Sequence, residues 1–307
     1  LVNPAKLIPT AIEFVDIAGL VAGASKGEGL GNRFLAHIRE VDAIIHVVRA
    51  FNDDDITHVS GHVDPISDAG TIETELALAD LETLERAIER TSKAAKTGDK
   101  KVLRELEILK TTHEALSNDT QIAALLTEDE VIHALKPLCL LTAKPVVYVA
   151  NVAENELQGN EKVEALRKHA AEAVAQLVVV SAAIEQEISE IDPSDRPSFL
   201  EDLGLDESGL DKVIRSGYDL LGLQTFFTAG PKEVRAWTVR RGATAPQAAG
   251  EIHTDFERGF IRAETIAYDD FIGLNGEQGA REAGRLRLEG KEYVLSDGDI
   301  MHFRFNV

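Results

Sequence analysis

The sequence predicts an α/β protein in which a parallel, doubly wound sheet is interrupted by a helical hairpin and followed by a smaller α+β module. Three observations predict this fold class. Strand-like and helix-like segments alternate on both sides of residues 71–136. That central stretch is rich in Glu, Leu, Ala and Lys and contains no proline. Beyond residue 226 the composition shifts to short strands separated by glycine-bearing turns.

The first 70 residues predict a strand, a glycine-rich loop, a helix and a second strand. Residues 11–15 read as a strand that runs into a polar turn at Asp16, and the loop covers residues 23–31. A helix is expected over residues 32–40. Residues 43–48 are nearly all apolar, which is typical of a strand covered on both faces. Strand, helix and strand at this spacing favour a parallel sheet.

Apolar residues at helical spacing predict two helices in the central stretch. The positions that mark them are Leu78, Leu81, Leu84 and Ile88 in the first, and Val102, Leu106, Leu109, His113 and Leu116 in the second. Gly98 and Asp99 lie between them, where a glycine ends one helix and an aspartate begins the next. We expect an antiparallel helical hairpin, inserted into the α/β domain, that carries no catalytic chemistry.

The α/β pattern resumes after the hairpin. Residues 145–150 predict a buried strand that ends at Asn151, and residues 162–175 predict a helix. The next strand covers residues 177–180 and ends at Ser181, and an acidic helical stretch follows. Strands over residues 233–240 and 300–305 predict that the last 80 or so residues form a compact α+β module.

Composition limits the classes of function. The 307 residues carry a formal net charge of −21, and 44% of them are hydrophobic, which is typical of a globular protein with a large core. No stretch approaches the ~18 uninterrupted apolar residues of a membrane span. The acidic surface repels nucleic acids and anionic membranes. Residues 226–307 hold 11 basic and 13 acidic residues, so this near-neutral module is the best candidate for contact with an acidic partner such as RNA.

The single cysteine, Cys139, excludes an intramolecular disulfide and fits a reducing compartment, so we expect a cytoplasmic protein. Because it lies in the apolar run LCLL, we expect a buried, inert thiol rather than a nucleophile. The chain begins with Leu1 rather than methionine, directly before a predicted strand, so we expect further residues to precede it.

Three strands of the predicted sheet end in polar clusters, and the order of these clusters along the chain indicates a function. The clusters are DIAG at residues 16–19, NVAE at 151–154 and SAA at 181–183. Ligands of doubly wound sheets bind beyond the carboxyl ends of the strands. Together the clusters follow the order of a guanine-nucleotide-type P-loop domain, in which D-x-x-G and N-K-x-D are followed by a backbone turn that supports the base. The same glycine-rich loop, 23–31, then reads as the segment that rearranges around a γ-phosphate.

Longer motifs resemble the YchF family of Obg-like ATPases across the whole chain. The run EFVDIAGLVAGASKGEGLGNRFLAHIREVDAIIHVVRAF is similar to its nucleotide-binding domain, and ELALADLETLERAI to the start of its helical insert. GATAPQAAGEIHTDFERGFIRAETI and GDIMHFRFNV resemble its terminal TGS domain. The resemblance implies a P-loop NTPase domain over residues 1–70 and 139–222, a coiled-coil hairpin over 71–138 and a β-grasp TGS domain over 223–307.

One departure from the family pattern concerns the phosphate-binding loop. No G-x-x-x-x-G-K-[ST] run occurs in the sequence, so its backbone cradle, its lysine and its Mg²⁺-binding hydroxyl are absent from these residues. We expect that the chain as given lacks the first strand, the P-loop and switch I of the domain, and that it binds nucleotide poorly. A natural pseudo-enzyme is the alternative.

The clusters and the resemblance assign site residues. Asn151, Val152 and Glu154 are expected at the base, with Ser181, Ala182 and Ala183 as a supporting turn. Asp16 is expected to hold Mg²⁺ through water, and Gly19 to face the γ-phosphate. Glu154 replaces the shorter aspartate that reads the N1–H and N2–H₂ edge of guanine, and Val152 replaces a lysine. Without the aspartate that recognises guanine, the site no longer discriminates against adenine. We therefore expect ATP to be preferred over GTP, as the family resemblance also implies. The alternative is an ordinary loop after a strand.

Hydrolysis requires a positioned water molecule. Leu20 stands where Ras-type enzymes have the glutamine that orients it. The resemblance implies that a loop histidine takes this role, and the matching residue is His58, whose ordinary pKa of ~6.5 suits the task. The alternative is a solvated loop histidine. His58 and His62 are four residues apart, but Gly61 and Pro65 argue against a helix that would align them as zinc ligands.

The resulting hypothesis is a Mg²⁺-dependent ATPase that acts as a slow nucleotide switch. The resemblance implies the ribosome as its partner, either the large subunit or the whole particle, and we expect a monomer with no membrane contact. RNA could be contacted by a phosphate-tracking groove drawn from Arg235, Arg240, Arg241, Arg258 and Arg262. Scattered, ion-paired arginines are the alternative to that groove. The alternative function is a non-hydrolytic adaptor that binds the ribosome or RNA through the TGS domain.

Overall fold

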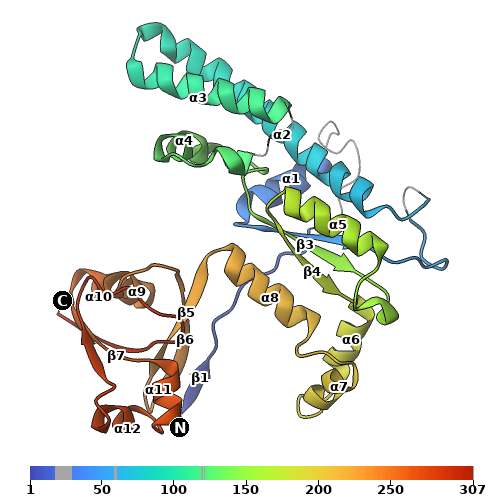
Figure 1. The fold of residues 1–307 in the computed structure, drawn as a ribbon. Coiled ribbons are helices and arrows are strands. Elements are labelled where there is room, and N and C mark those ends of the chain that lie inside the picture. The colour runs from blue at the N-terminus through green and yellow to red at the C-terminus, as the bar shows by residue number, and fades with distance from the viewer. Residues whose placement is uncertain (18–29, 59–60, 119, 121, 307) are drawn as a thin grey trace. The chain divides into compact units, whose positions relative to one another are not determined.

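The computed structural model describes residues 1–17, 30–58, 61–118, 120 and 122–306 (Figure 1). The chain divides into two compact units. Residues 15–220 form the larger unit, and residues 1–14 join residues 221–307 in the smaller one. Residues 1–14, which we expected in the domain of the strands that follow them, are grouped with the smaller unit.

The larger unit is built on a parallel sheet with the strand order β2-β3-β4. The strands are β2 (Ile44–Arg49), β3 (Val146–Asn151) and β4 (Gln176–Val180), each within a residue or so of its predicted range. In the register of the ladders, Arg49 is level with Asn151, and Asn151 with Val180. The three strands therefore end at one edge of the sheet.

Helices cover both faces of this sheet (Figure 1). Helices α2 (Pro65–Ala94) and α5 (Glu161–Glu172) pack on one face and α8 (Gly209–Leu220) on the other. The other helices of the larger unit are α1 (Leu30–Glu40), α3 (Lys100–Ser117), α4 (Asp129–Leu135), α6 (Ala182–Glu190) and α7 (Arg196–Asp202). Single 3-10 turns lie at Ala95–Thr97, Ile122–Leu125, Lys136–Leu138 and Glu154–Glu156. Alternate residues of β3 face opposite sides, so Tyr148 packs in the core shared with α2 and α5, and Val147 in the core shared with α8.

Helix α2 belongs to two parts of the larger unit. Its amino-terminal half packs on the sheet through Ala69, which is fully buried, and its carboxyl-terminal half packs against α3 through Leu84. Gly98, which follows α2 and the 3-10 turn at its end, has φ of 79°. The Asp99 side chain caps α3 by accepting a hydrogen bond from the N–H of Lys101. The helix begins at Pro65, before the expected start of the insert at residue 71. Its first turns are part of the α/β layer.

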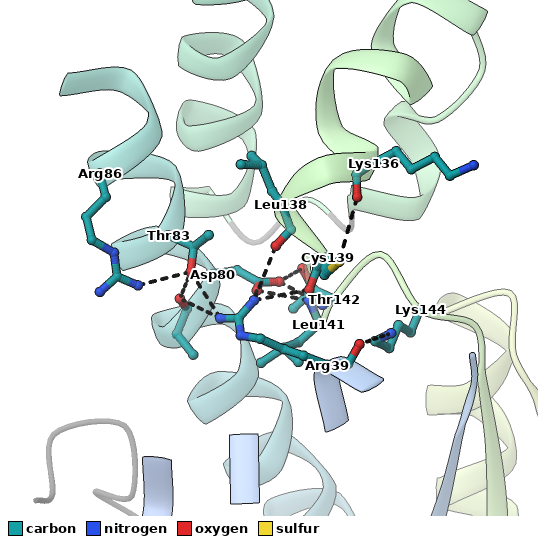
Figure 2. Close-up of polar contacts among 11 residues, drawn as sticks. Arg39, Asp80, Thr83, Arg86, Lys136, Leu138, Cys139, Leu141, Thr142 and Lys144 are labelled. Carbon is teal, nitrogen blue, oxygen red and sulfur yellow. Dashed lines mark hydrogen bonds and ion pairs between the residues drawn. The ribbon is translucent and has the colours of Figure 1, made fainter. Parts of the chain in front are cut away.

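The base of this helix pair is fastened to α1 and to the segment before β3 by a buried polar junction (Figure 2). Asp80 of α2 is fully buried, and its carboxylate accepts hydrogen bonds from the N–H groups of Leu141 (2.9 Å) and Thr142 (2.8 Å). Arg39 near the end of α1 donates to the carbonyl of Cys139 (3.1 Å) and to the hydroxyl of Thr83 (3.0 Å). The junction thus joins three segments that are distant in sequence.

Cys139 departs from its expected burial. The residue ends a 3-10 turn in the left-handed conformation, with φ of 46°, and its thiol side chain is exposed. The neighbouring Leu140 and Leu141 are buried. The turn places the cysteine on the outside of the apolar run that suggested a core position.

The smaller unit contains a six-stranded sheet with the order β1-β6-β5-β9-β7-β8. The strands are β1 (Lys6–Ile8), β5 (Leu223–Ala229), β6 (Glu233–Arg240), β7 (Phe260–Ile266), β8 (Arg287–Glu289) and β9 (Ile300–Phe305). The helices are α9 (Ala245–Ile252), α10 (Thr254–Arg258), α11 (Tyr268–Gly273) and α12 (Glu277–Glu282). Phe226, Met301 and Phe303 fill the core between this sheet and α9.

The strand expected over residues 11–15 is not formed. Residues 6–8 form β1 instead, pairing in parallel with β6 so that Lys6 lies opposite Glu233. The reason is the availability of a partner, because a strand needs a free ladder edge and β6 offers one to residues 6–8. Among the residues that the structure describes, no helix is both long and apolar enough to span a bilayer.

Candidate functional site

The carboxyl edge of the β2-β3-β4 sheet collects most of the predicted site residues. Asn151 is the last residue of β3, and Ser181 follows the last residue of β4. Backbone hydrogen bonds hold these ends together, since the N–H of Ala50 donates to the carbonyl of Asn151 and the N–H of Val152 to that of Val180, both at 2.8 Å. The edge is therefore a rigid platform from which three loops leave the sheet.

The Asn151 side chain bridges two of these loops. Its Oδ1 accepts a hydrogen bond from the N–H of Ala182 at 3.0 Å. Because Oδ1 is held by the backbone at the start of α6, the Nδ2 group of the same amide is directed elsewhere and can donate. A purine offers the acceptor N7 to such a donor.

The turn over residues 181–183 begins α6 without a side-chain cap. Ser181 has extended backbone angles and is 1% exposed, and its Oγ has no hydrogen-bond partner in the part of the chain that the structure describes. Ala182 and Ala183 are exposed. The small side chains of these two alanines leave little bulk at the surface of the turn.

Val152 differs from the expectation of a base contact. Its side chain is 2% exposed and lies in the apolar core with Val48, Val163 and Leu157. Burial of this apolar side chain stabilises the fold. Glu154, by contrast, is exposed at the start of a 3-10 turn. The structure thus leaves Asn151 and Glu154 as the accessible side chains of this cluster.

The loop that carries His58 leaves the sheet at the same edge. Arg49, the last residue of β2, shapes the loop by donating to three of its carbonyl groups, those of Phe51 (3.1 Å), Asp53 (3.2 Å) and Ile56 (2.9 Å). The guanidinium carbon also lies 4.7 Å from the centroid of the Phe51 ring. These contacts turn the loop back toward the sheet.

His58 is not a solvated loop side chain. Its Nε2 lies 3.0 Å from Oδ2 of Asp68, and only 16% of its side chain is exposed. His62 is exposed and lies outside any helix. Within the described part of the chain, no three His, Cys, Asp or Glu side chains are grouped as a metal site, so His58 and His62 have no third ligand there.

The D-x-x-G cluster is described only at its start. The Asp16 side chain is exposed, and Ile17 packs against the core formed by α1 and α2 with Leu35 and Leu76. This packing anchors the cluster beside α1. Gly19 and Leu20 lie outside the described residues.

Comparisons with known proteins extend these observations. The family model described as a 50S ribosome-binding GTPase matches residues 2–79. The model of the YchF-GTPase C-terminal domain, described as a protein of unknown function, matches residues 223–306. The chain is 59% identical to the ribosome-binding ATPase YchF of Haemophilus ducreyi over 307 residues, which cover 100% of this chain and 85% of that protein. The chain belongs to the YchF family of Obg-like ATPases.

Other YchF relatives and a solved structure agree. The ribosome-binding ATPase YchF of Bacillus subtilis is 58% identical over all of this chain and 85% of its own length. Obg-like ATPase 1 of Rattus norvegicus is 43% identical over 99% of this chain and 78% of its own. The structure of the Schizosaccharomyces pombe YchF GTPase aligns with a TM-score of 0.86 at 38% identity, covering 98% of this chain and 82% of that one. The predicted family and α/β fold class are confirmed.

The sequence reasoning missed Asp68 in this YchF-family chain. A signal for it existed, because Asp64 followed by Pro65 is a strong helix start, with Asp64 as N-cap and proline at the first helical position. That start places Asp68 in the first turn of α2. Its contact with His58 also depends on the path of the loop after β2, which no local sequence pattern predicts.

Proposed function

We propose that this protein is an ATP-hydrolysing, ribosome-associated switch that binds its nucleotide at the carboxyl edge of the β2-β3-β4 sheet. The observation that carries the nucleotide site is the hydrogen bond from the N–H of Ala182 to Oδ1 of Asn151, which fixes an amide donor at the end of β3. Relatives that the chain matches over its whole length are named ribosome-binding ATPases. The hydrogen bond supports the position of the nucleotide site, and the names of the relatives support the ATPase activity.

The base is read by Asn151 and Glu154 in this proposal. The Nδ2 group of Asn151 donates to N7, which adenine and guanine share, so this contact selects purines without distinguishing them. Discrimination rests on Glu154, whose exposed side chain is one methylene longer than the aspartate that reads guanine. The longer carboxylate displaces the two acceptor oxygens from the guanine edge and favours ATP. Ser181, Ala182 and Ala183 support the base from the neighbouring turn.

The residues present fit a Mg²⁺ ion that is held mainly by nucleotide phosphates and water. Asp16 offers an exposed carboxylate, and Mg²⁺ in nucleotide sites is commonly bound through one or two carboxylates plus phosphates. Asp16 would hold the ion through water, Gly19 would face the γ-phosphate, and the ion would neutralise charge that develops on the phosphates. His58 acts on the attacking water in this scheme, by accepting a hydrogen bond that orients it.

Phosphate release by the product of the complete open reading frame tests the nucleotide specificity. We expect faster release from ATP than from GTP, and we expect Glu154→Asp to shift the ratio of kcat/KM values toward GTP. Glu156→Asp, in the same 3-10 turn, is the matched control and is expected to leave the ratio unchanged. Equal or faster turnover of GTP by the unmodified protein would remove Glu154 as the determinant. Ribosome binding without any phosphate release would favour the non-hydrolytic adaptor.

The proposed ribosome contact draws support from one face of the smaller unit. Arg262 of β7 lies directly opposite Arg304 of β9 in the ladder, and both side chains are exposed. Glu264 pairs with Arg304 at 3.2 Å and offsets one of these charges. Arg235 does not share this setting, because it stacks on the Trp237 ring at 3.8 Å. Arg262 and Arg304 are therefore the residues on which the test of this contact is based.

Sedimentation with ribosomal particles across a salt series tests the contact. Binding through phosphates weakens steeply as salt rises, and each lost phosphate contact lowers the salt slope by about one. We expect Arg262→Glu combined with Arg304→Glu to weaken binding and flatten that slope. Lys291→Glu, an exposed lysine of the same unit, is the control. No binding to ribosomal particles at low salt with ATP present would contradict the proposed partner.

A further inference from the structure

The contact between His58 and Asp68 joins the loop after β2 to the first turn of α2. Nε2 of the histidine lies 3.0 Å from Oδ2 of the aspartate, and the two side chains are 16% and 31% exposed. Here a carboxylate from a separate element fixes one of its two ring nitrogens.

Asp68 stands on a rigid base. Asp64 caps α2 by accepting hydrogen bonds from the N–H groups of Ile66 and Ser67, and the N–H of Asp68 itself donates to the carbonyl of Asp64 at 2.9 Å. The next residue, Ala69, is fully buried against the sheet. A carboxylate in the first turn of a helix also gains from the positive end of the helix dipole. The aspartate is therefore placed independently of the loop.

The chemistry of the pair fixes which nitrogen carries the proton. An ionised carboxylate can only accept hydrogen bonds, so the Nε2 atom that faces it carries a hydrogen. In a neutral imidazole the other nitrogen, Nδ1, is then the acceptor atom. A carboxylate in this position sets the tautomer and orientation of a working histidine and stabilises its positively charged form, as in the Ser-His-Asp triad.

We propose that Asp68 is a positioning residue for His58 in ATP hydrolysis, an inference that rests on the function proposed above. Asp68 holds Nε2–H and so fixes the tautomer and the orientation of the ring that acts on the attacking water. The oxygen of that water bonds to the γ-phosphorus while the bond from the γ-phosphorus to the bridging oxygen of ADP breaks. The products are ADP, inorganic phosphate and a proton, and Asp68 touches none of the reacting atoms.

Steady-state kinetics of four proteins test the assignment in the product of the complete open reading frame. These are the unmodified protein, His58→Ala, Asp68→Asn and the double variant. Loss of an outer-shell partner typically lowers activity ~10–100-fold, so we expect Asp68→Asn to lower kcat within that range while KM for ATP changes by no more than about twofold. In the His58→Ala background we expect Asp68→Asn to change kcat by less than about twofold, because its effect passes through the histidine.

Asp64→Asn is the matched control. It removes one negative charge from the same end of the same helix, and asparagine is as good an N-cap as aspartate, so kcat is expected to stay within about twofold of the unmodified value. A urea titration of each variant shows that the comparison is made between folded proteins. An equal loss of kcat from Asp68→Asn in both backgrounds, or no loss in the unmodified background, would overturn the positioning role.

The failure of this inference can be told apart from failure of the proposed function. If His58→Ala leaves kcat unchanged, or if no ATP is hydrolysed, the proposed function of His58 fails and the positioning role falls with it. If His58→Ala abolishes turnover and Asp68→Asn does not lower it, only the present inference fails. ¹⁵N shifts of the His58 ring report the contact itself. We expect the Nε2–H tautomer in the unmodified protein and a mixture of tautomers in Asp68→Asn, and an unchanged tautomer would overturn the inference.

Discussion

Arg39 and Asp80 form an ion pair at 3.8 Å in which the carboxylate is fully buried and the guanidinium is one-quarter exposed (Figure 2). Burial raises the pKa of Asp80, while the hydrogen bonds from Leu141 and Thr142 and the charge of Arg39 act in the opposite direction. The carboxylate is thus retained in a core position by partners from two other segments. Its removal has consequences for the whole helix pair.

We predict that Asp80→Ala lowers the free energy of unfolding by about 3 kcal/mol, because it leaves two N–H groups without acceptors and one arginine without its counter-ion. Urea unfolding followed by circular dichroism measures the change. Glu82→Ala, at an exposed position on the same helix, is the control and should change the stability by less than about 0.5 kcal/mol. Similar losses from both substitutions would show that the junction adds nothing special.

His46 predicts a pH dependence of stability. Its pKa is lowered from 6.5 mainly by burial, with Glu73 and Asp68 opposing and His169 reinforcing that shift. The folded state therefore binds the proton more weakly than the unfolded chain does. The contribution of neutral His46 to the free energy of unfolding is fully present above 6.5, the pKa of the unfolded state, and is lost as the pH falls through the lower pKa of the folded state.

We accordingly expect the urea concentration at the unfolding midpoint to decrease when the pH is lowered from 7.5 to 5.5. The decrease should be smaller in His46→Gln, because glutamine cannot be protonated. The difference between the two proteins isolates His46 from the other histidines. His133→Gln, an exposed histidine on α4, should retain the full pH dependence. An identical pH dependence in His46→Gln would contradict the assignment.

Asn151→Ala is predicted to weaken nucleotide binding about 10- to 100-fold, equivalent to about 1–3 kcal/mol, since it removes the amide donor and leaves the N–H of Ala182 without its acceptor. Titration calorimetry with ATP and with GTP measures the effect, which should be similar for both nucleotides because N7 is common to them. Asn155→Ala, in the exposed 3-10 turn nearby, is the control. A loss confined to one nucleotide would show that Asn151 contacts something other than N7.

Gly259 is predicted to resist substitution. A Cβ atom at this position would lie 2.2 Å from the carbonyl oxygen of Asn306, where the start of β7 and the end of β9 are joined by a backbone hydrogen bond. Gly259→Ala should therefore lower the unfolding free energy by about 1–3 kcal/mol through forced backbone movement. Gly290→Ala, where nothing lies within 4 Å, is the matched control. Equal melting temperatures would show that the strand ends adjust freely.

The parts that followed from sequence are those governed by local pattern. The apolar run before Asn151 defines β3 because both faces of that strand are covered, and the polar residue marks where cover ends. Gly98 and Asp99 define the turn between α2 and α3 because a left-handed cap and an N-cap have few alternatives. These features depend on neighbours within a few residues, so the sequence carries them directly.

The parts that did not follow depend on contacts between distant segments. Residues 11–15 have a strand-like composition, but residues 6–8 are the ones that pair with the edge of β6. Val152 occupies a lysine position in a binding motif, yet its burial among Val48 and Val163 depends on how α5 packs. The exposure of Cys139 follows from one left-handed turn inside an apolar run. Only the folded chain decides such cases.

The outward-facing Cys139 gives this chain a built-in attachment point for a spectroscopic reporter. It is the single cysteine of these 307 residues, so a maleimide dye would label one position among them. Its carbonyl group accepts a hydrogen bond from Arg39 at 3.1 Å, which places the dye beside the joint between α1 and the paired helices. Fluorescence anisotropy during nucleotide addition would then follow, in real time, whether that joint loosens as the ligand state changes.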